Sequence, residues 1–308
     1  MMPVAKPIRD LHHMQTGHKM NNAYVDLGSA LTSLLERHDN PTSDRIGSGF
    51  PRLDEYTGGF VPGELIVLAS RPSMGRNPVL IRMIDAVALE HGKAVLVAST
   101  DHDVDRFCQY GIGSQFPWFG LRDRIRRSDL EDKHRKYLSY LVEKYKASPI
   151  VVVDRAGLSV KQISQQAEAI RINVGPLGLI VVTNGDAMNL QKFGTSRYDQ
   201  LLGLSKALKK LARRHSCTVL VESEVSRGLE RRKRKYMRPR PNDLCCRGAL
   251  AKYADKLLFV YNDQIYFPNA SPCREIIIGK NRNGPVGFMD INEDQIYKRL
   301  DRRQNLQE

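Results

Sequence analysis

A short loop between an apolar run and a helix-like stretch has the residue types of a phosphate site. The loop reads Ser-Arg-Pro-Ser-Met-Gly-Arg-Asn over residues 70–77 and follows the apolar residues 65–69. Where a strand turns into a helix, the loop amides and the helix N-terminus together bind phosphate. Such loops usually end in Gly-Lys-Ser/Thr, whose lysine reaches the terminal phosphates and whose hydroxyl binds Mg²⁺. Arg76 and Asn77 stand in these two places, so the frame predicts a phosphate site whose side chains depart from the usual pattern.

A basic run is the second candidate site. Residues 227–240 read Arg-Gly-Leu-Glu-Arg-Arg-Lys-Arg-Lys-Tyr-Met-Arg-Pro-Arg. Clustered basic side chains bind nucleic-acid phosphates without reading sequence, and an aromatic ring among them, here Tyr236, can stack on a base. The whole chain has 48 basic side chains against 34 acidic ones, a net charge of +14. Both features favour a nucleic-acid partner; a solvated surface loop is the alternative.

Length and composition exclude several classes of protein. The 308 residues suffice for one large domain or two small ones. No apolar run is long enough for a membrane span, and the first residues lack the apolar stretch of a secretory signal. The five cysteines form no Cys-x-x-Cys motif, which favours reduced thiols over a zinc site or a disulfide framework. We therefore expect a cytoplasmic protein without membrane association.

Alternating strand and helix patterns position both candidate sites. Apolar runs predict buried strands at 65–69, 94–98, 150–153, 179–182, 218–221, 257–261 and 275–278. Helices between and beside the first five strands are predicted at 78–91, 103–115, 127–146, 159–173 and 197–215. This alternation predicts a mostly parallel sheet with helices on both faces. The close spacing of the last strands predicts an antiparallel hairpin.

Leucine spacing predicts one more helix, near the N-terminus. Leu27, Leu31, Leu34 and Leu35 fall on one face of a helix over residues 25–38. A single leucine-faced helix cannot bury that face by itself. It must therefore dock on its own domain or on a neighbouring subunit.

Five sequence blocks together resemble one helicase family. They are 46–65 with a Thr-Gly-Gly turn, Arg-Pro-Ser-Met-Gly at 71–75, 176–182, 223–230, and Glu-Ile-Ile-Ile-Gly-Lys-Asn-Arg-Asn-Gly-Pro at 275–285. Their order and spacing resemble the helicase domain of the bacterial replicative helicase DnaB, from about residue 46 to residue 290. Recombinases of the RecA kind share the fold and the turn but lack the Arg-Pro-Ser-Met-Gly and Gly-Lys-Asn-Arg-Asn-Gly-Pro strings.

The resemblance implies a fold, a division of the chain and an assembly. The fold is α/β, a RecA-like P-loop NTPase fold with a mostly parallel twisted sheet flanked by helices and a short helical N-terminal arm. The expected segments are a flexible arm with a linker-like helix over 1–45, a DnaB-type helicase domain over 46–297 and a tail over 298–308. In the family the linker helix docks on the adjacent subunit of a ring. A homo-oligomeric hexameric ring, or a mixed ring with an authentic DnaB-type helicase, is therefore expected.

By resemblance, ATP and Mg²⁺ are the ligands of the loop. The expected nucleotide site comprises the loop and the residue at the Walker B position: Ser70, Arg71, Pro72, Ser73, Met74, Gly75, Arg76, Asn77 and Thr183. The metal falls to Asn77, with Asp186 as a compensating ligand. Asp101 stands at the place of the family's catalytic glutamate, and Glu224 at that of the glutamine that senses the γ-phosphate.

These replacements weaken the charge arrangement of the expected site. Phosphoryl transfer depends on positioning and charge neutralisation, and arginine has a wider fork than lysine. Thr183 has no carboxylate, Asp101 is shorter than glutamate, and a carboxylate at Glu224 repels phosphate. We therefore expect weak or absent ATP hydrolysis. Lys280 and Arg282, in contrast, match the family's catalytic finger, which reaches a neighbouring subunit's nucleotide. The alternative is that their motif only forms a stable hairpin.

The resemblance also places the nucleic-acid contacts. In the family, the loops after the fourth and fifth strands line the central channel and follow single-stranded DNA. Here the basic run occupies the first region, and residues 243–248 correspond to the second. The expected contacts are Arg227, Arg231, Arg232, Lys233, Arg234, Lys235 and Gly248.

Three functions are compatible with these residues. The first is a DnaB-like replicative helicase domain that acts on single-stranded DNA in DNA replication with an impaired ATP site. The second is an active ATP-dependent 5′–3′ DNA helicase in which Asp101 and Asp186 supply the acidic groups. The third is a non-catalytic regulator that binds an authentic replicative helicase through the leucine-faced helix and the hairpin at 280–282, without contacting DNA.

Overall fold

The computed structural model describes residues 27–28, 31–32, 35, 45–100, 105, 107–109, 111, 129–233, 237–270 and 274–292. The chain divides into two units, Met1–Asp44 and Arg45–Glu308. In the first unit the described residues Leu27, Gly28, Leu31, Thr32 and Leu35 are helical, and the three leucines are exposed. These residues agree with the leucine-faced helix that the sequence predicts.

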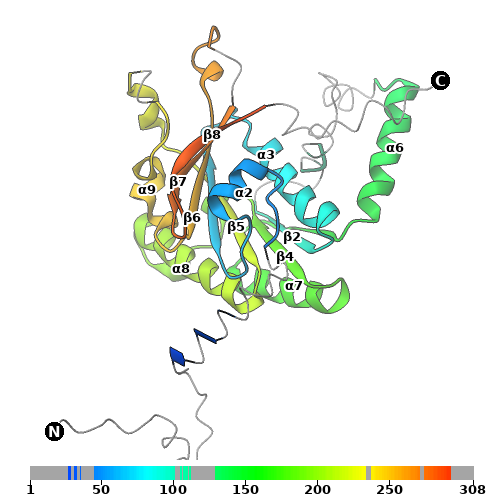
Figure 1. The fold of residues 1–308 in the computed structure, drawn as a ribbon, viewed down its shortest axis with the longest axis horizontal. Helices are drawn as coiled ribbons and strands as arrows, with labels where there is room; N and C mark the ends of the chain where they lie inside the picture. Colours follow the sequence, from blue (N-terminus) through cyan, green and yellow to red (C-terminus); the bar gives the residue numbers. More distant parts are fainter. Residues whose placement is uncertain are drawn as a thin grey trace, which may run out of the picture. The chain divides into compact units, whose positions relative to one another are not determined.

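The strands of the second unit form one sheet (Figure 1). Among the described residues the sheet has eight strands in the order β3-β2-β4-β5-β1-β6-β7-β8. Their bounds are β1 Leu65–Ser70, β2 Ala94–Ser99, β3 Ile150–Asp154, β4 Leu177–Val182, β5 Thr218–Glu224, β6 Lys256–Asn262, β7 Arg274–Asn281 and β8 Gly287–Ile291. The strands from β3 to β6 in this order are parallel, while β7 and β8 are antiparallel. The mostly parallel sheet and the terminal hairpin are therefore confirmed.

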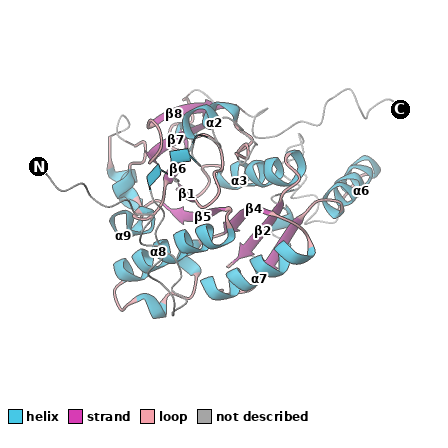
Figure 2. Ribbon diagram, turned by 60° about the horizontal axis from the view of Figure 1, so that its bottom comes forward, coloured by secondary structure: helices cyan, strands magenta, loops and turns pink. Residues whose placement is uncertain are grey.

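The helices cover both faces of the sheet. Their bounds are α2 Pro51–Thr57, α3 Arg76–Asp85 (continued by a π-helical turn, Ala86–Glu90), α6 Asp132–Lys146, α7 Val160–Asn173, α8 Arg197–His215 and α9 Cys245–Gly248. Figure 2 shows α2 and α3 on one side and α7 and α8 on the other. Of the helix predicted at 103–115, only 105, 107–109 and 111 are described, and these are helical.

Side-chain capping sets the starts of two helices. The Ser159 hydroxyl accepts the backbone N–H of Gln162 at 3.3 Å at the start of α7. The Ser196 hydroxyl accepts the N–H of Asp199 at 3.0 Å at the start of α8. Serine at this position satisfies a backbone donor that the helix leaves unpaired. Both helices therefore begin within one residue of the predicted starts.

Two apolar cores lie on the two faces of the sheet. Leu65, Val67 and Ala69 of β1 belong to the core that includes apolar residues of α7 and α8. Ile66 and Leu68 belong to the core that includes apolar residues of α3. Strands buried on both faces are uniformly apolar, as parallel strands usually are. The sheet therefore fixes the carboxyl ends of β1, β4 and β5 at one edge, where open α/β sheets bind ligands.

Within the described residues, no helix combines the length and the apolar character needed to cross a membrane.

Candidate functional site

The loop after β1 has the backbone frame of a phosphate site. Gly75 precedes α3 with φ of +85°, and Ser73 also has a positive φ, +66°. A Cβ atom on Gly75 would lie 2.5 Å from Nε of Arg274, which is at the start of β7. Buried Met74 anchors the loop because its sulfur accepts the N–H of Asn262 at 3.3 Å. The predicted strand–loop–helix arrangement is therefore present.

The Arg76 side chain is committed to β5. Its Nε lies 2.7 Å from Oε1 of Glu222. The two side chains form an ion pair, but the angles at these two atoms are not those of a hydrogen bond. Nη1 of Arg76 donates to the backbone carbonyl of Ser223 at 2.7 Å. The side chains of Arg76 and Glu222 are 17% and 5% exposed. The positive charge that would face a terminal phosphate is thus neutralised inside the protein.

Arg71 is committed to a different segment. Its Nε donates to Glu230 at 2.8 Å, and its Nη1 donates to the carbonyl of Val225 at 3.2 Å. Glu230 also accepts a long hydrogen bond from the Tyr266 hydroxyl at 3.5 Å. Arg71 therefore ties the loop to the residues that follow β5, where the basic run begins.

The position after β4 carries hydroxyl and amide groups rather than a carboxylate. The Thr183 hydroxyl accepts the N–H of Thr100 at 3.3 Å and donates to the carbonyl of Ala98 at 3.4 Å. Thr183 is buried, so its hydroxyl serves the contact between β2 and β4. Asn77, the second residue of α3, is half-buried.

Asp186 lies near this edge but is already paired. Nη2 of Arg197 donates to its carboxylate at 3.2 Å, and the Ser223 hydroxyl donates to it at 3.3 Å. Burial raises the pKa of Asp186 above its ordinary value, and Arg197 and Ser223 offset part of that rise. The Glu224 carboxylate, exposed at the end of β5, also raises the pKa of Asp186. No group of three or more His, Cys, Asp or Glu residues in the described chain could hold a metal ion.

The structure brings part of the predicted site together. Ser70 pairs with Glu224 where β1 and β5 end, and Arg76, Thr183 and Asp186 contact residues of the same edge. Asp101 lies outside the described residues. Sequence reasoning missed Glu222, whose only signal was a charge directly after the apolar run 218–221. It also missed Arg274, which only the pairing of β7 with β6 brings to the loop.

Lys280 and Arg282 lie at the other ends of the strands, on the side of the sheet where the parallel strands begin. Because β7 is antiparallel, Arg274 pairs with the end of β6, whereas Lys280 pairs with Leu257 near its start. Nζ of Lys280 donates to the carbonyls of Ala251 at 3.0 Å and Lys252 at 3.3 Å. Burial, and next the Arg282 charge, lower the pKa of Lys280.

Arg282 is more open than Lys280. Its side chain is 53% exposed, and its Nη1 lies 3.8 Å from Oδ1 of Asp255. Its backbone N–H donates to the Asp255 carbonyl at 2.9 Å. The length of β7 places Arg282 about 20 Å from the end of the sheet where the loop lies. The two predicted finger residues are therefore too far from the loop of their own chain to contact it.

The basic run divides into paired and exposed cations. Arg232 donates to the Asp243 carboxylate at 2.9 Å, and Arg238 to that of Glu275 at 2.7 Å. These arginines fasten the segment to the fold. Three more residues of the run are predicted to contact nucleic acid and lie in the described part of the chain. Their side chains are exposed; they are Arg227, Arg231 and Lys233. The predicted contacts Arg234 and Lys235 lie outside the described residues.

The second predicted nucleic-acid loop is tightly turned. Cys246 and Arg247 have positive φ values of 51° and 53°, and Gly248 has φ of +79°. A Cβ on Gly248 would lie 2.9 Å from the carbonyl oxygen of Pro241. Glycine is therefore required at this position, and its backbone remains the candidate contact.

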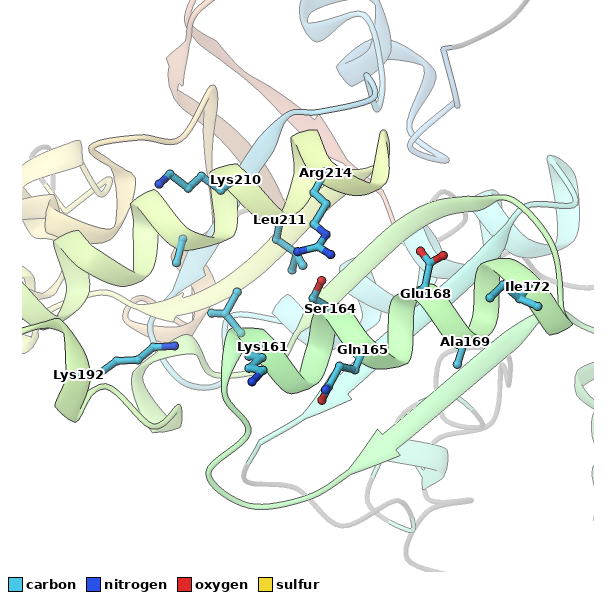
Figure 3. Close-up of a pocket in the computed structure, with 12 residues that line it drawn as sticks. Lys161, Ser164, Gln165, Glu168, Ala169, Ile172, Lys192, Lys210, Leu211 and Arg214 are labelled. Carbon is cyan, nitrogen blue, oxygen red and sulfur yellow. The ribbon is translucent and has the colours of Figure 1, made fainter. Parts of the chain in front are cut away.

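A groove of ≈ 720 Å³ lies between α7 and α8 (Figure 3). Its lining includes apolar Val160, Ile172 and Leu211 and the basic side chains of Lys210 and Arg214. The groove is on the face of the sheet opposite α3. It contains none of the predicted site residues.

Comparisons with known proteins agree with this geometry. The family model for the DnaB-like helicase C terminal domain matches residues 45–302. The replicative DNA helicase DnaB of Haemophilus influenzae is 29% identical over 273 residues, and that of Pasteurella multocida is 30% identical over 274 residues. Each alignment covers 88% of this chain and 58% of the relative, so the chain spans less than two thirds of these relatives.

Solved structures give the same result. A solved ATPase domain superposes with a TM-score of 0.79 and 25% identity, covering 87% of this chain and 95% of that domain. A DnaB-like replicative helicase, solved in a study of its interactions with primase, superposes with a TM-score of 0.77 and 26% identity, covering 86% and 65% of the two chains. Both neighbours confirm the RecA-like fold. The chain therefore belongs to the family of DnaB-like helicase C-terminal domains.

Proposed function

We propose that this chain is a DnaB-type ring subunit that binds single-stranded DNA in DNA replication and hydrolyses ATP weakly or not at all. The observation that carries the proposal is the engagement of Arg76 by Glu222 and Ser223. In the family pattern the residue at this position faces the terminal phosphates. Here its charge is neutralised before any ligand arrives.

The loop fits a phosphate better than it fits a metal–nucleotide complex. DnaB-like ATPase domains use nucleotide and Mg²⁺ in general, and the positive φ of Gly75 and the start of α3 supply a phosphate-binding frame here. Mg²⁺ prefers carboxylate and water oxygens in octahedral geometry. Thr183 offers no carboxylate, and that of Asp186 already contacts Arg197. Asn77 is the remaining candidate ligand, so we propose loose nucleotide binding without an effective metal site.

The placement of Lys280 and Arg282 supports a ring. Both lie at the sheet edge away from the loop of their own chain. Arg282 is exposed enough to reach another subunit, and the exposed leucines of the first unit need an apolar partner. The ring is made of copies of this chain or of this chain mixed with an authentic DnaB-type helicase. In a mixed ring, this subunit can complete a neighbour's site without having a working site of its own.

The charge distribution supports a nucleic-acid partner. The net charge is +14, and Arg227, Arg231 and Lys233 are exposed in a segment that ion pairs fasten to the fold. Contacts of this kind bind single strands through the backbone, with strong salt dependence and little sequence preference.

Two measurements on the full chain test the proposal. Steady-state ATP hydrolysis with excess single-stranded DNA should stay near background. Vigorous turnover that Arg76→Ala abolishes would instead support the active helicase with an unusual site. The logarithm of the association constant for an oligonucleotide should fall linearly with the logarithm of the salt concentration. The slope should be roughly −0.7 for each phosphate contact.

A matched pair of variants locates the DNA contacts. Arg231→Gln with Lys233→Gln should lower the salt slope by about 1.4, if each side chain neutralises one phosphate. Lys210→Gln with Arg214→Gln removes the same charge from the groove on α8 and should leave the slope nearly unchanged. Equal effects of both pairs would show that only net charge matters, and absence of binding would favour the non-catalytic regulator.

A further inference from the structure

We propose that Glu222 is a built-in counter-ion of the phosphate loop. Its carboxylate pairs with Arg76, the cation that an incoming phosphate would need. The proposal rests on the proposed function, because it gives a physical cause for an impaired nucleotide site. It also assigns a role to a residue that lies outside the family's motifs as they occur in this sequence. The anion affinity of the loop is then set by one ion pair.

The direction of the Glu222 side chain follows from the pleat of β5. Val219 and Val221 belong to the core on the α7–α8 face, and Leu220 belongs to the core on the α3 face. Side chains alternate along a strand, so Glu222 shares the face of Leu220. Its register partner on β1 is Leu68, a residue of the same α3-side core. Glu222 is therefore a carboxylate at the end of an apolar row, directly beneath the start of α3.

Arg76 is what makes this carboxylate tolerable. A buried charge is strongly unfavourable unless it is paired and hydrogen-bonded. The guanidinium supplies the charge at 2.7 Å from Glu222 and uses a further donor on the carbonyl of Ser223, also at 2.7 Å. Arginine suits this arrangement because its planar fork can serve two acceptors at once, which a lysine ammonium does less well.

An anion in the loop must compete with Glu222. If Arg76 turned toward a phosphate, the carboxylate would remain buried without its partner, which is the costly way to break such a pair. If Arg76 stayed, the phosphate would meet a neutral pair rather than a cation. Both routes lower the affinity for phosphate relative to a loop with an uncommitted cation. Removing the negative charge of Glu222 should therefore raise the affinity.

A different role for the same carboxylate predicts the opposite result. In an active site with unusual residues, Glu222 would replace the missing acidic group and hold a metal or orient water. Its carboxylate, however, is 5% exposed and in contact with a guanidinium. A loss of Mg²⁺-dependent nucleotide binding on substitution would support that role and overturn the counter-ion.

The decisive experiment is calorimetric titration of the full chain with inorganic pyrophosphate and with ATP, each with and without Mg²⁺. Glu222→Gln keeps the shape of the side chain and an acceptor for Arg76 but removes the charge. We expect pyrophosphate to bind at least tenfold more tightly than to the unmodified chain, without a need for Mg²⁺. Glu168→Gln is the matched control, because it makes the same charge change on the exposed surface of α7. Equal affinities of the two variants, or weaker binding by Glu222→Gln, would overturn the proposal.

A second variant guards against a folding defect. Arg76→Lys with Glu222→Leu returns an apolar side chain to the row and leaves an uncommitted cation, and it should show the same gain. Failure of the gain in this folded variant as well would show that the pair is structural only. That result would overturn the counter-ion alone, because weak ATP hydrolysis would still follow from the missing carboxylate at Thr183 and the pairing of Asp186 with Arg197. Rapid ATP hydrolysis by the unmodified chain would instead contradict the proposed function itself.

Discussion

The buried carboxylate of Asp85 makes the stability of the α3–α6 contact depend on pH. Asp85 is the last residue of α3 and accepts the Tyr145 hydroxyl of α6 at 3.1 Å and 3.2 Å. Burial raises its pKa from 3.8 to about 6, although Lys144, Tyr145 and Arg82 act in the opposite direction. The pKa is therefore higher in the folded state than in the unfolded state. As pH rises from 4 to above 6, the folded state must release a proton that the unfolded state has already lost.

The size of this effect follows from the two pKa values. A rise from 3.8 to about 6 corresponds to about 3 kcal/mol, at about 1.4 kcal/mol per pH unit. The free energy of unfolding should therefore fall by up to about 3 kcal/mol between pH 4 and pH 7 through this residue. Asp85→Asn removes the charge and keeps an acceptor for Tyr145. We expect it to stabilise the protein at pH 7.5 by about 1–2 kcal/mol, or about 3–6 °C in Tm, and to give no gain at pH 4.5.

Denaturant unfolding and thermal melting at several pH values between 4.5 and 8 measure this difference. Glu143→Gln is the control, because that side chain is 73% exposed on α6 and pairs with Lys146 at the surface. A stability gain for Asp85→Asn that is the same at every pH would refute the reasoning. So would a loss of stability at pH 7.5, since the Tyr145 contact would then outweigh the cost of burying the charge.

Three other predictions concern the loops and the hairpin. Gly248→Ala, at φ of +79° with a carbonyl oxygen 2.9 Å from the new Cβ, should destabilise the protein by at least ~1–2 kcal/mol and weaken single-stranded DNA binding, as melting and oligonucleotide titration would show. Burial raises the pKa of Cys217 and Cys245 to about 12 and about 11; mass spectrometry after alkylation at pH 7.5 should find both thiols little modified, and the rate at half-buried Cys245 should rise about tenfold per pH unit. Lys280→Ala removes hydrogen bonds to two backbone carbonyls and should lower the free energy of unfolding by about 1–2 kcal/mol. Arg282→Ala should change the free energy of unfolding by less than about 0.5 kcal/mol. It should nevertheless reduce ATP hydrolysis in a mixed ring with an authentic helicase.

The strands and helices that could be predicted are those whose signal is local. The apolar runs of the parallel strands are continuous because both faces of the sheet are covered, and serine caps fix the starts of α7 and α8. Strand β8 was missed because only Met289 and Ile291 point inward, while Phe288 is 52% exposed. Its period of two over five residues is too short to separate from a loop, and pairing with β7 decides its structure.

The loop frame was predictable for the same reason, but its chemistry was not. Sequence comparison shows which residue stands at the lysine position and cannot show what that residue contacts. Glu222 lies 146 residues further along the chain than Arg76, and only the pairing of β1 with β5 brings it under the loop. Read one by one, the replacements at the site suggest lost functions. The ion pair shows that the replacement at 76 also has a structural partner. The charges of Arg76 and Glu222 neutralise each other at a site where the glutamate alone would be a buried, uncompensated charge. Removing the charge of Glu222 should therefore free the Arg76 cation for phosphate. Restoring lysine at 76 alone should not restore phosphate binding, because the lysine would still face the Glu222 carboxylate.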